Sequence, residues 1–474
     1  MESPCPRCGC SPAPEADPAD RGQLRLRLAQ LNSLIASLSA EHERLLAQSD
    51  SIVYPVLSLP PEVVSLIFIR CIPSGSPVYP SPIEAPLLLT QICRQWREIA
   101  IDTPELWQSI ALLDTRSVEV FNSWILRSGS LPLTFSLNCV DPIHAASLLD
   151  VCLPHVRRWQ DVELALPAGV LRRLDDDFPL LMLRNISLLL RGPFSQDGNL
   201  TTTQPITMSN APLLCSANVA TYPDVALELP WTQLTSLTLG RLDPGDCFAI
   251  LQRCPLLTTL DISITGAATE AESLPLLTLP LLESFTFPSD LSTALPRLRF
   301  PRLAHIHIRE TVVFGAAHAG ALQTLLTHVP APVARLALTL KYPASPTLEH
   351  CLAAVPASLP TLALHCGNAA TIAPLLAVLQ RPGVLPALAR LRIAGGRVFD
   401  GDYAEIAAML RARLGTLHEF VLVVETYGRA EAARDVPRIR AMPRFRALAA
   451  DGLRMRIEQP VYPVLTALDQ GVGT

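Results

Sequence analysis

The residues best suited to chemistry are the cysteines and histidines. Cys5, Cys8 and Cys10 stand near the N-terminus, and a CxxC pair has the spacing with which two thiolates bind zinc. No second CxxC and no paired histidine stands near enough to complete a tetrahedral site. His305 and His307 alternate along one predicted strand, but no Asp, Glu or Cys flanks them at matching positions. We therefore expect neither a metal site nor a cofactor.

The short motifs that mark many enzymes do not occur in the sequence. It contains no GxxxxGK[ST] or GxGxxG loop for phosphates, no HExxH pair for zinc and no GxSxG turn for a nucleophilic serine. The 10 histidines are spread singly through an apolar background. We expect a protein that carries out no bond chemistry of its own.

The elements that position these residues must come from a long and apolar chain. Of its 474 residues, 49% are apolar and 17% are charged, so the chain is too apolar to be disordered throughout. At ~150 residues per domain, this length corresponds to about three domains or to one long repeat array. A single compact core is not expected for a chain of this size.

Proline and charge limit where the protein acts. The least charged stretch, 351–380, is interrupted by Pro356, Pro360 and Pro374, so it lacks the ~20 uninterrupted apolar residues that span a membrane. The first twenty residues carry no apolar core of a secretory signal. The net charge of -5 argues against a nucleic-acid-binding face. We expect an intracellular protein, cytoplasmic or nuclear, that contacts neither membrane nor nucleic acid.

The N-terminal region is expected to be a disordered arm, 1–20, followed by a leucine-rich helix, 21–50. Between 23 and 48 the apolar residues alternate in spacings of four and three, with His42 at the single polar position of the seam. These residues are Leu24, Leu28, Leu31, Ile35, Leu38 and Leu45. Two interpretations stay open: a coiled coil that makes a homodimer through 23–48, or a helix that packs its leucines on the next domain.

Residues 54–113 carry the signals of three short helices. Pro60 and Pro61 open the first, and a loop rich in Pro and Ser, 73–82, follows it. The second helix carries Trp96 on an apolar face, and the third begins at a proline that follows a capping residue. Three short helices make a small domain that gains stability by docking on another surface.

Three segments of this region together resemble the F-box, the adaptor-binding module of cullin-RING ubiquitin ligases. They are Leu59–Val64, Ile92–Ala100 and Thr103–Trp107, and their order, residue types and spacing match jointly. The following segment, Trp124–Leu133, is similar to F-box proteins that are abundant in mushroom-forming fungi. The Pro/Ser loop is longer than in a minimal F-box, which affects the local spacing of the helices.

The resemblance implies a surface that binds a Skp-family adaptor and, through it, a cullin. The residues that would form this surface and its supporting core are Leu59, Pro60, Ile67, Phe68, Trp96 and Trp107. The alternative is that the same side chains form only the core of the three-helix unit. We expect Trp96 and Ile92 in that core, and Leu59 and Pro60 at the interface.

Beyond Val151 a repeat dominates: an apolar residue, two variable residues, an apolar residue, one variable residue and another apolar residue. Ten copies lie between Leu183 and Leu422, and their middle residues, from Ile186 to Phe420, are 26 residues apart on average. This spacing falls within the ~20–29 residues of leucine-rich repeats. Strands that alternate with returning helices and stack on their neighbours form a solenoid.

The expected fold is therefore α/β: an N-terminal helix and a three-helix F-box, followed by an irregular leucine-rich-repeat solenoid. The solenoid is expected over 151–457. A connecting helix and strand, 114–150, precede it, and a tail, 458–474, follows it.

Residues that flank the apolar positions of each strand must lie on the opposite, concave face, because strand side chains alternate with a period of two. In the later repeats this face is basic. The candidate target-binding residues are His305, His307, Arg309, Arg335, Arg390 and Arg392. Arginine forks on this face would suit an acidic or phosphorylated partner segment. The alternative is a solvated face without a ligand.

These features predict a non-catalytic substrate-receptor subunit of a cullin-RING (SCF-type) ubiquitin ligase. The F-box would hold the adaptor while the solenoid holds an unknown target protein. The alternative is a leucine-rich-repeat scaffold that dimerises through the N-terminal helix and has no ligase function. Repeat folds host many unrelated binding functions, so the sequence does not identify the target.

Overall fold

The computed structural model divides the chain into two compact units, Met1–Ile67 and Phe68–Thr474. The structure describes residues 18–51, 55–73, 77–113, 118–174, 178–191, 205–220, 227–264, 274–288, 294–309, 320, 322–326, 329, 332–340, 352, 355–366, 372–381, 383–395, 400–424, 438–439 and 442–458. The cysteines of the predicted arm and residues 459–474 of the predicted tail lie outside these ranges. Among the described residues, no helix has the length and apolar character needed to cross a membrane.

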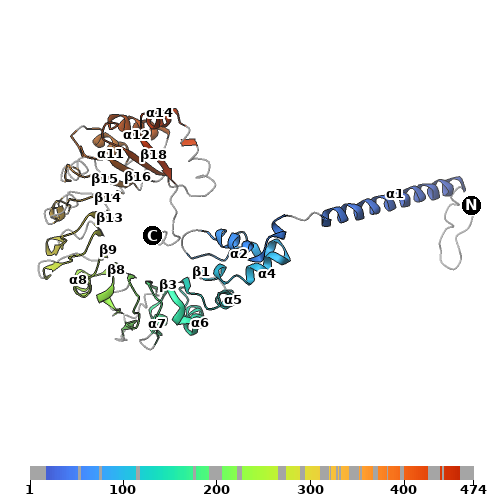
Figure 1. The fold of residues 1–474 in the computed structure, drawn as a ribbon, viewed down its shortest axis with the longest axis horizontal. Coiled ribbons are helices and arrows are strands. Elements are labelled where there is room, and N and C mark those ends of the chain that lie inside the picture. Colours follow the sequence, from blue (N-terminus) through green and yellow to red (C-terminus); the bar gives the residue numbers. More distant parts are fainter. Residues whose placement is uncertain are drawn as a thin grey trace, which may run out of the picture. The chain divides into compact units, whose positions relative to one another are not determined.

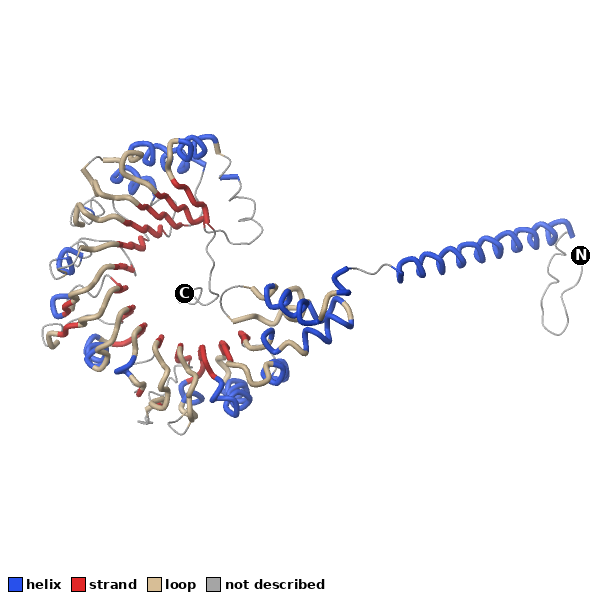
Figure 2. Tube along the Cα trace, viewed as in Figure 1, coloured by secondary structure: helices blue, strands red, loops and turns tan. Residues whose placement is uncertain are grey.

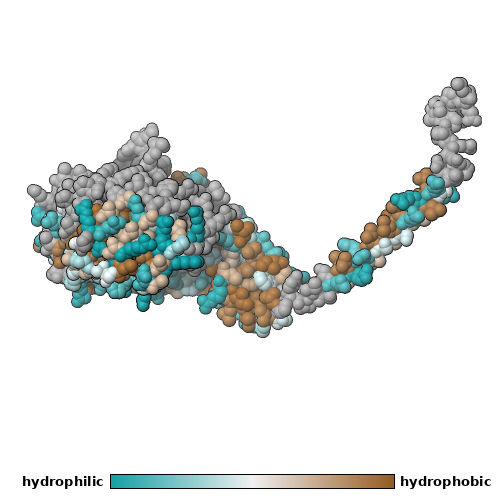
Figure 3. Space-filling model, turned by 90° about the horizontal axis from the view of Figure 1, so that it is seen from above, coloured by the Kyte–Doolittle hydropathy of each residue, from teal (hydrophilic) through white to brown (hydrophobic). Residues whose placement is uncertain are grey.

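The first unit contains a long helix, α1 (Pro18–Ser51), over the segment where the leucine-rich helix is predicted. A short 3-10 turn, η1 (Pro55–Ser58), follows it. All side chains from Gln23 to Gln48 are exposed, and Leu24 is 62% exposed. Figure 3 shows these apolar side chains in brown along α1. The leucines of the predicted seam are therefore not buried in this structure.

Helix α2 (Pro61–Arg70) begins where two prolines fix helical dihedrals at the first turn, and Glu62 lies in that turn, where the helix dipole favours an acid. Apolar residues at helical spacing bury one stripe of the helix, with Val64 2% and Phe68 1% exposed. The first predicted helix of the box therefore forms over ten residues.

The second helix that the sequence predicts is divided into α3 (Leu89–Ile92) and α4 (Arg94–Ile101). Cys93 separates them because its backbone is extended, and its thiol accepts a 3.5 Å hydrogen bond from the backbone N–H of Trp96. The third predicted helix is a single 3-10 turn, η2 (Pro104–Leu106). The three helices of an F-box are thus not reproduced as three continuous helices.

The rest of the second unit is an α/β solenoid built on one 14-stranded parallel sheet. Its strands, in spatial order, are β1 (Ser109–Leu113), β2 (Leu133–Asn138), β3 (Trp159–Pro167), β4 (Asn185–Arg191), β6 (Ser216–Ala220), β8 (Ser236–Leu242), β9 (Thr259–Ile264), β11 (Ser284–Pro288), β13 (His305–Arg309), β14 (Arg335–Leu340), β15 (Thr361–Cys366), β16 (Arg390–Gly395), β17 (Glu419–Val424) and β18 (Arg454–Glu458). The spatial order follows the chain order, so each strand pairs with the repeat before it and the repeat after it. Within this unit the strands line the inner side of a curve and the helices lie on its outer side (Figures 1 and 2).

The connections between the strands contain short helices, strands and turns. The α-helices are α5 (Val118–Arg127), α6 (Pro142–Cys152), α7 (Ala168–Leu171), α8 (Pro244–Gln252), α11 (Ile372–Leu379), α12 (Asp400–Ala412) and α14 (Pro443–Ala450). The 3-10 turns are η3 (Leu153–Arg158), η4 (Trp231–Gln233) and η7 (Leu295–Arg297). These connections also form two small parallel sheets, separate from the main sheet: β5 (Ile206–Thr207) pairs with β7 (Leu227–Glu228), and β10 (Leu277–Thr278) pairs with β12 (Leu298–Arg299). Asp141 and Asp243 begin α6 and α8 by accepting backbone N–H groups.

The sheet begins earlier than the repeat pattern from Val151 predicts. β1 and β2 belong to the segments 54–113 and 114–150, yet both pair in parallel with the strand that follows them. Val78 of the Pro/Ser loop accepts a 2.8 Å hydrogen bond from the N–H of Ala111 at the outer edge of β1. This contact covers an edge that would otherwise expose unpaired backbone groups.

The core of the solenoid is a column of apolar side chains in register. From β8 to β17 the middle residue of each repeat faces its equivalent on the next strand, and all of them are at most 1% exposed. These residues are Leu237, Leu260, Phe285, Ile306, Leu336, Leu362, Leu391 and Phe420. Full burial of one such side chain contributes about 1.5–3 kcal/mol. The column accounts for the leucine-rich composition.

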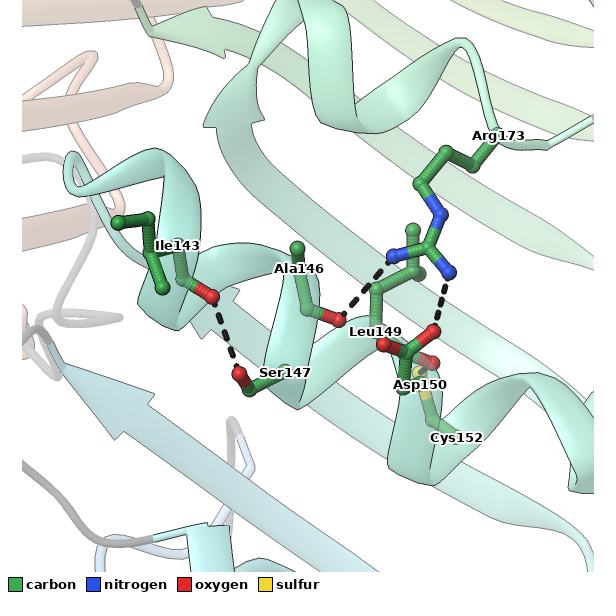
Figure 4. A network of polar contacts seen from close by, with 7 residues as sticks. All are labelled: Ile143, Ala146, Ser147, Leu149, Asp150, Cys152 and Arg173. Atoms are coloured by element: carbon green, nitrogen blue, oxygen red, sulfur yellow. Dashed lines mark hydrogen bonds and ion pairs between the residues drawn. The ribbon is translucent and has the colours of Figure 1, made fainter.

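Polar contacts connect successive helices on the outer side. Arg173, just after α7, donates a 3.4 Å hydrogen bond to the carbonyl of Ala146 in α6 and pairs with the carboxylate of Asp150 (Figure 4). The Cys152 thiol donates to the carbonyl of Leu149 within the same helix at 3.3 Å. Both partners of the Arg173–Asp150 pair are exposed, so the pair contributes little stability and mainly orients the turn after α7.

Candidate functional site

The strand register arranges the polar side chains of the inner face in rows. The first row, from β11 to β18, is Ser284, His305, Arg335, Thr361, Arg390, Glu419 and Arg454. The second row, on the same strands, is Thr286, His307, Ala337, Ala363, Arg392, Val421 and Arg456. Five of the six candidate target-binding residues lie in these rows, and Arg309, two residues after His307 on β13, lies on the same face.

His307 does not add positive charge to this face at neutral pH. Its Nε2 lies 3.0 Å from the hydroxyl of Thr339 on the next strand. The pKa of His307 is lowered to about 4, chiefly by burial and further by the neighbouring cations Arg309 and Arg335. The imidazole is therefore neutral at pH 7 and is held inside the row.

Arg309 is also committed within the protein. Its Nη2 forms an ion pair with the carboxylate of Asp261, and it donates a 3.2 Å hydrogen bond to the carbonyl of Ile262. The side chains of Arg309 and Asp261 are 31% and 27% exposed, so the pair is partly shielded from solvent. The positive charge that the sequence places at Arg309 is thus balanced by β9.

The basic character of the face comes from β14 and from β16 to β18. Arg390 and Arg456 each approach Glu419, at 3.5 Å and 3.6 Å, and Arg392 approaches Glu458 at 3.0 Å. The side chains of Arg390 and Arg456 are 68% exposed. Among the described residues, these ion pairs use one nitrogen of each guanidinium group: Nε of Arg390 and Arg456, and Nη1 of Arg392.

Sequence reasoning missed Arg454 and Arg456 because β18 departs from the repeat. The register pairs Phe420 with Met455 and Leu422 with Ile457, so the first apolar position of the repeat falls on Gly452, which has a φ of 96°. The alternation of apolar and basic residues from Leu453 to Ile457 is the signal that would have identified this strand.

The candidate adaptor residues of the first unit reach solvent. Leu59 is half-buried, Pro60 is exposed and Ile67 is 43% exposed. Val63 and Leu66, on the same helix, are also exposed. The first unit therefore presents apolar side chains at the start and middle of α2.

The candidate adaptor residues of the second unit lie mostly in its core. Phe68 is buried and its ring centroid lies 4.9 Å from that of the half-buried Trp96. Trp107 is fully buried, donates from its indole N–H to the carbonyl of Ala100 at 2.8 Å and packs on Trp124. Phe68 and Trp107 are thus core residues of the second unit.

Ile92 was expected in the core, and this expectation is wrong. Its side chain is 52% exposed because α3 ends at this residue and the extended Cys93 redirects the chain. Ile83 and Leu88, which precede it, are 79% and 40% exposed. The second unit therefore presents three exposed apolar side chains between the Pro/Ser loop and α4, none of which sequence reasoning selected as an adaptor-binding residue.

Comparison with known proteins adds little to this description. No family model and no curated protein sequence matches the chain. One solved structure that it resembles is the leucine-rich-repeat-containing protein LegL7 of Legionella pneumophila, with a TM-score of 0.32 and 14% sequence identity, over 52% of this chain and 82% of that chain. Within the part of the chain that the structure describes, no group of three or more His, Cys, Asp or Glu side chains is placed to hold a metal ion.

Proposed function

We propose that the protein is a non-catalytic substrate receptor of a cullin-RING ubiquitin ligase. The observation that carries this proposal is the order of two parts: segments that resemble an F-box, followed by an α/β solenoid with an accessible inner face. In this scheme the box binds a Skp-family adaptor and the solenoid binds a target protein. The receptor then acts by proximity, because it raises the effective concentration of the target beside the conjugating enzyme.

Exposed apolar side chains support the adaptor-binding role. Exposed apolar clusters on small helical units mark interaction surfaces when they exceed isolated residues. The first unit exposes Pro60 and Ile67, and the second unit, considered by itself, exposes Ile83, Leu88 and Ile92. Buried aromatic side chains beneath, such as Trp107, would keep the second group rigid.

Co-purification with a Skp-family adaptor tests the proposal. The full chain is co-expressed with the adaptor, and we expect a stoichiometric complex. The variant Leu59→Asp with Pro60→Ala should lose the complex, whereas Ile143→Asp, an 80% exposed apolar position on α6, should retain it. Absence of a complex, or equal retention by both variants, would contradict the proposal.

A second function is favoured by α1. Its seam residues are exposed over four heptads, and leucines at alternating spacings of three and four normally bury against a partner helix. We propose, as the alternative, a leucine-rich-repeat scaffold that dimerises through this helix. His42 is the single polar residue of the seam.

Sedimentation of the full chain separates the two functions. For the scaffold we expect a dimer that ignores the adaptor. Leu31→Glu with Leu38→Glu should then give a monomer. The matched pair Ala29→Glu with Ala36→Glu adds the same charges to the same helix outside the seam and should remain dimeric. A monomeric wild-type protein would refute dimerisation.

A further inference from the structure

We propose that the inner face of β14–β18 binds an acidic, extended segment of a partner protein. This inference rests on the proposed target-binding role of the solenoid and names the chemistry of the target. The binding residues are Arg335, Arg390, Arg392, Arg454 and Arg456. The centre of the proposed site therefore lies on the C-terminal strands and not at His307 and Arg309.

The first step is the placement of the arginines. Arg335, Arg390 and Arg454 occupy the first row on β14, β16 and β18, and Arg392 and Arg456 occupy the second row on β16 and β18. Neighbouring strands lie ~4.8 Å apart, so arginines on alternate strands are separated by about 10 Å along a row. The five arginine positions therefore form a grid on one face.

The second step is the charge balance. Among the described residues, Glu419 and Glu458 form the ion pairs with this grid, and two glutamates leave an excess of positive charge on five arginines. Within the described residues no ion pair involves Arg335 or Arg454.

The third step is the availability of donors. A guanidinium group has five N–H donors in a planar fork. Glu419 is approached through Nε of Arg390 and Nε of Arg456, and Glu458 through Nη1 of Arg392. The remaining donors of each fork can bind a carboxylate with two parallel hydrogen bonds.

The second row of the inner face carries small side chains on β14 and β15. In the second row, Ala337 and Ala363 occupy β14 and β15, so two neighbouring strands carry only methyl groups there. Ala337 is half-buried and Ala363 is 8% exposed, so a bound segment would contact the arginines that flank these methyl groups and not the sheet itself. The flanking arginines would reach the carboxylates of the bound segment. His307 occupies the second row on β13 and is neutral, so it neither repels a cation nor attracts an anion.

The arginine spacing suggests a probe. A polyproline II segment has three residues per turn and rises ~3.1 Å per residue, so every third side chain lies on one face about 9 Å from the next. That distance is close to the separation of arginines on alternate strands. A fluorescein-labelled peptide with Glu at every third position and Pro between them is therefore the probe, and the same peptide with Gln is its control.

Fluorescence anisotropy with the full chain tests the proposal. We expect the Glu peptide to bind, the Gln peptide to bind at least about tenfold more weakly, and binding to weaken as salt is raised. Arg335→Ala with Arg454→Ala leaves the glutamate pairs intact and should weaken binding about tenfold or more. Arg444→Ala with Arg446→Ala removes two exposed arginines from α14 and should leave binding unchanged.

Three results would overturn the proposal: equal binding of the Glu and Gln peptides, equal effects of the two double variants, or tighter binding of an oligoribonucleotide of the same charge. Unfolding midpoints of both variants should match the wild type, which excludes loss of the fold as the cause. Adaptor co-purification is measured on the same variants and should be unchanged. Failure of peptide binding with the adaptor retained would reject this inference alone.

Discussion

Arg413 is a buried cation held only by carbonyl groups among the described residues, and its replacement gives a quantitative test of how the last repeats are joined. The residue follows α12 and is 6% exposed. Its Nε donates to the carbonyl of Leu379 at 2.7 Å and its Nη1 to that of Leu385 at 3.0 Å. Its Nη2 donates to the carbonyls of Arg381, at 3.2 Å, and Val384.

These four contacts hold the turn between α11 and β16. The carbonyl of Leu379 lies at the end of α11, where the helix dipole favours a positive charge. Leu385 has a φ of 48°, a left-handed conformation that costs a side-chain-bearing residue about 1–2 kcal/mol. Burial lowers the pKa of Arg413, yet an arginine stays charged in proteins.

Arg413→Met should therefore destabilise the repeats around it. The carbonyl of the buried Leu379 would lose its donor, at about 1–3 kcal/mol, whereas the carbonyl of Leu385 still accepts the N–H of Leu388 at 3.1 Å. The carbonyls of Arg381 and Val384 lie on more exposed residues and can bind water. The mutant no longer desolvates a cation, which offsets part of the loss, so we expect a net loss of about 1–3 kcal/mol.

Two measurements check this prediction: urea unfolding gives the free energy of unfolding, and hydrogen exchange locates the loss of protection along the chain. The loss of protection should concentrate in 372–395, because solenoid repeats contact mainly their neighbours. Arg413→Lys is the matched control: it keeps the charge but replaces the fork with one ammonium, so it should recover only part of the stability. Wild-type stability in the Met variant, or full recovery by Lys, would refute the reasoning.

Two further predictions concern the sheet. A Cβ at Gly395 would lie 2.8 Å from the carbonyl oxygen of Cys366. Gly395→Ala should therefore lower the thermal midpoint, at a cost of about 1–3 kcal/mol. Gly169→Ala is the control, because its Cβ meets no atom within 4 Å and the thermal midpoint should not change. The pKa of His307 is lower in the folded chain than its ordinary 6.5, so the unfolded chain binds more protons between about pH 6.5 and 4. Stability should thus fall by about 3 kcal/mol as pH drops through this window, and His307→Gln should remove that share of the pH dependence in urea titrations.

The repeat pattern predicts the solenoid because each strand is specified locally. A residue such as Leu336 or Phe420 is identified from its neighbours three positions before and two after, and burial follows from stacking identical units. β18 was missed where Gly452 replaces the leading leucine. The break at Cys93 was missed because the residues around it, Leu88 to Ile99, follow a continuous helical period.

The charge state of the inner face cannot be predicted from a local sequence pattern. Arg309 and Asp261 are 48 residues apart in sequence and meet only because β9, β11 and β13 are adjacent in register. The low pKa of His307 likewise depends on its burial between strands. A list of basic residues therefore predicts the face but not which of its cations are available.

The arrangement of the available cations follows from what a parallel sheet tolerates. Like charges directly opposite each other on neighbouring strands destabilise a sheet. In the first row Thr361 separates Arg335 from Arg390, and Glu419 separates Arg390 from Arg454. In the second row Val421 lies between the two arginines. The alternation that protects the sheet also places the arginines of one row about 10 Å apart along the backbone, and a ligand must match this spacing to contact more than one arginine of the row.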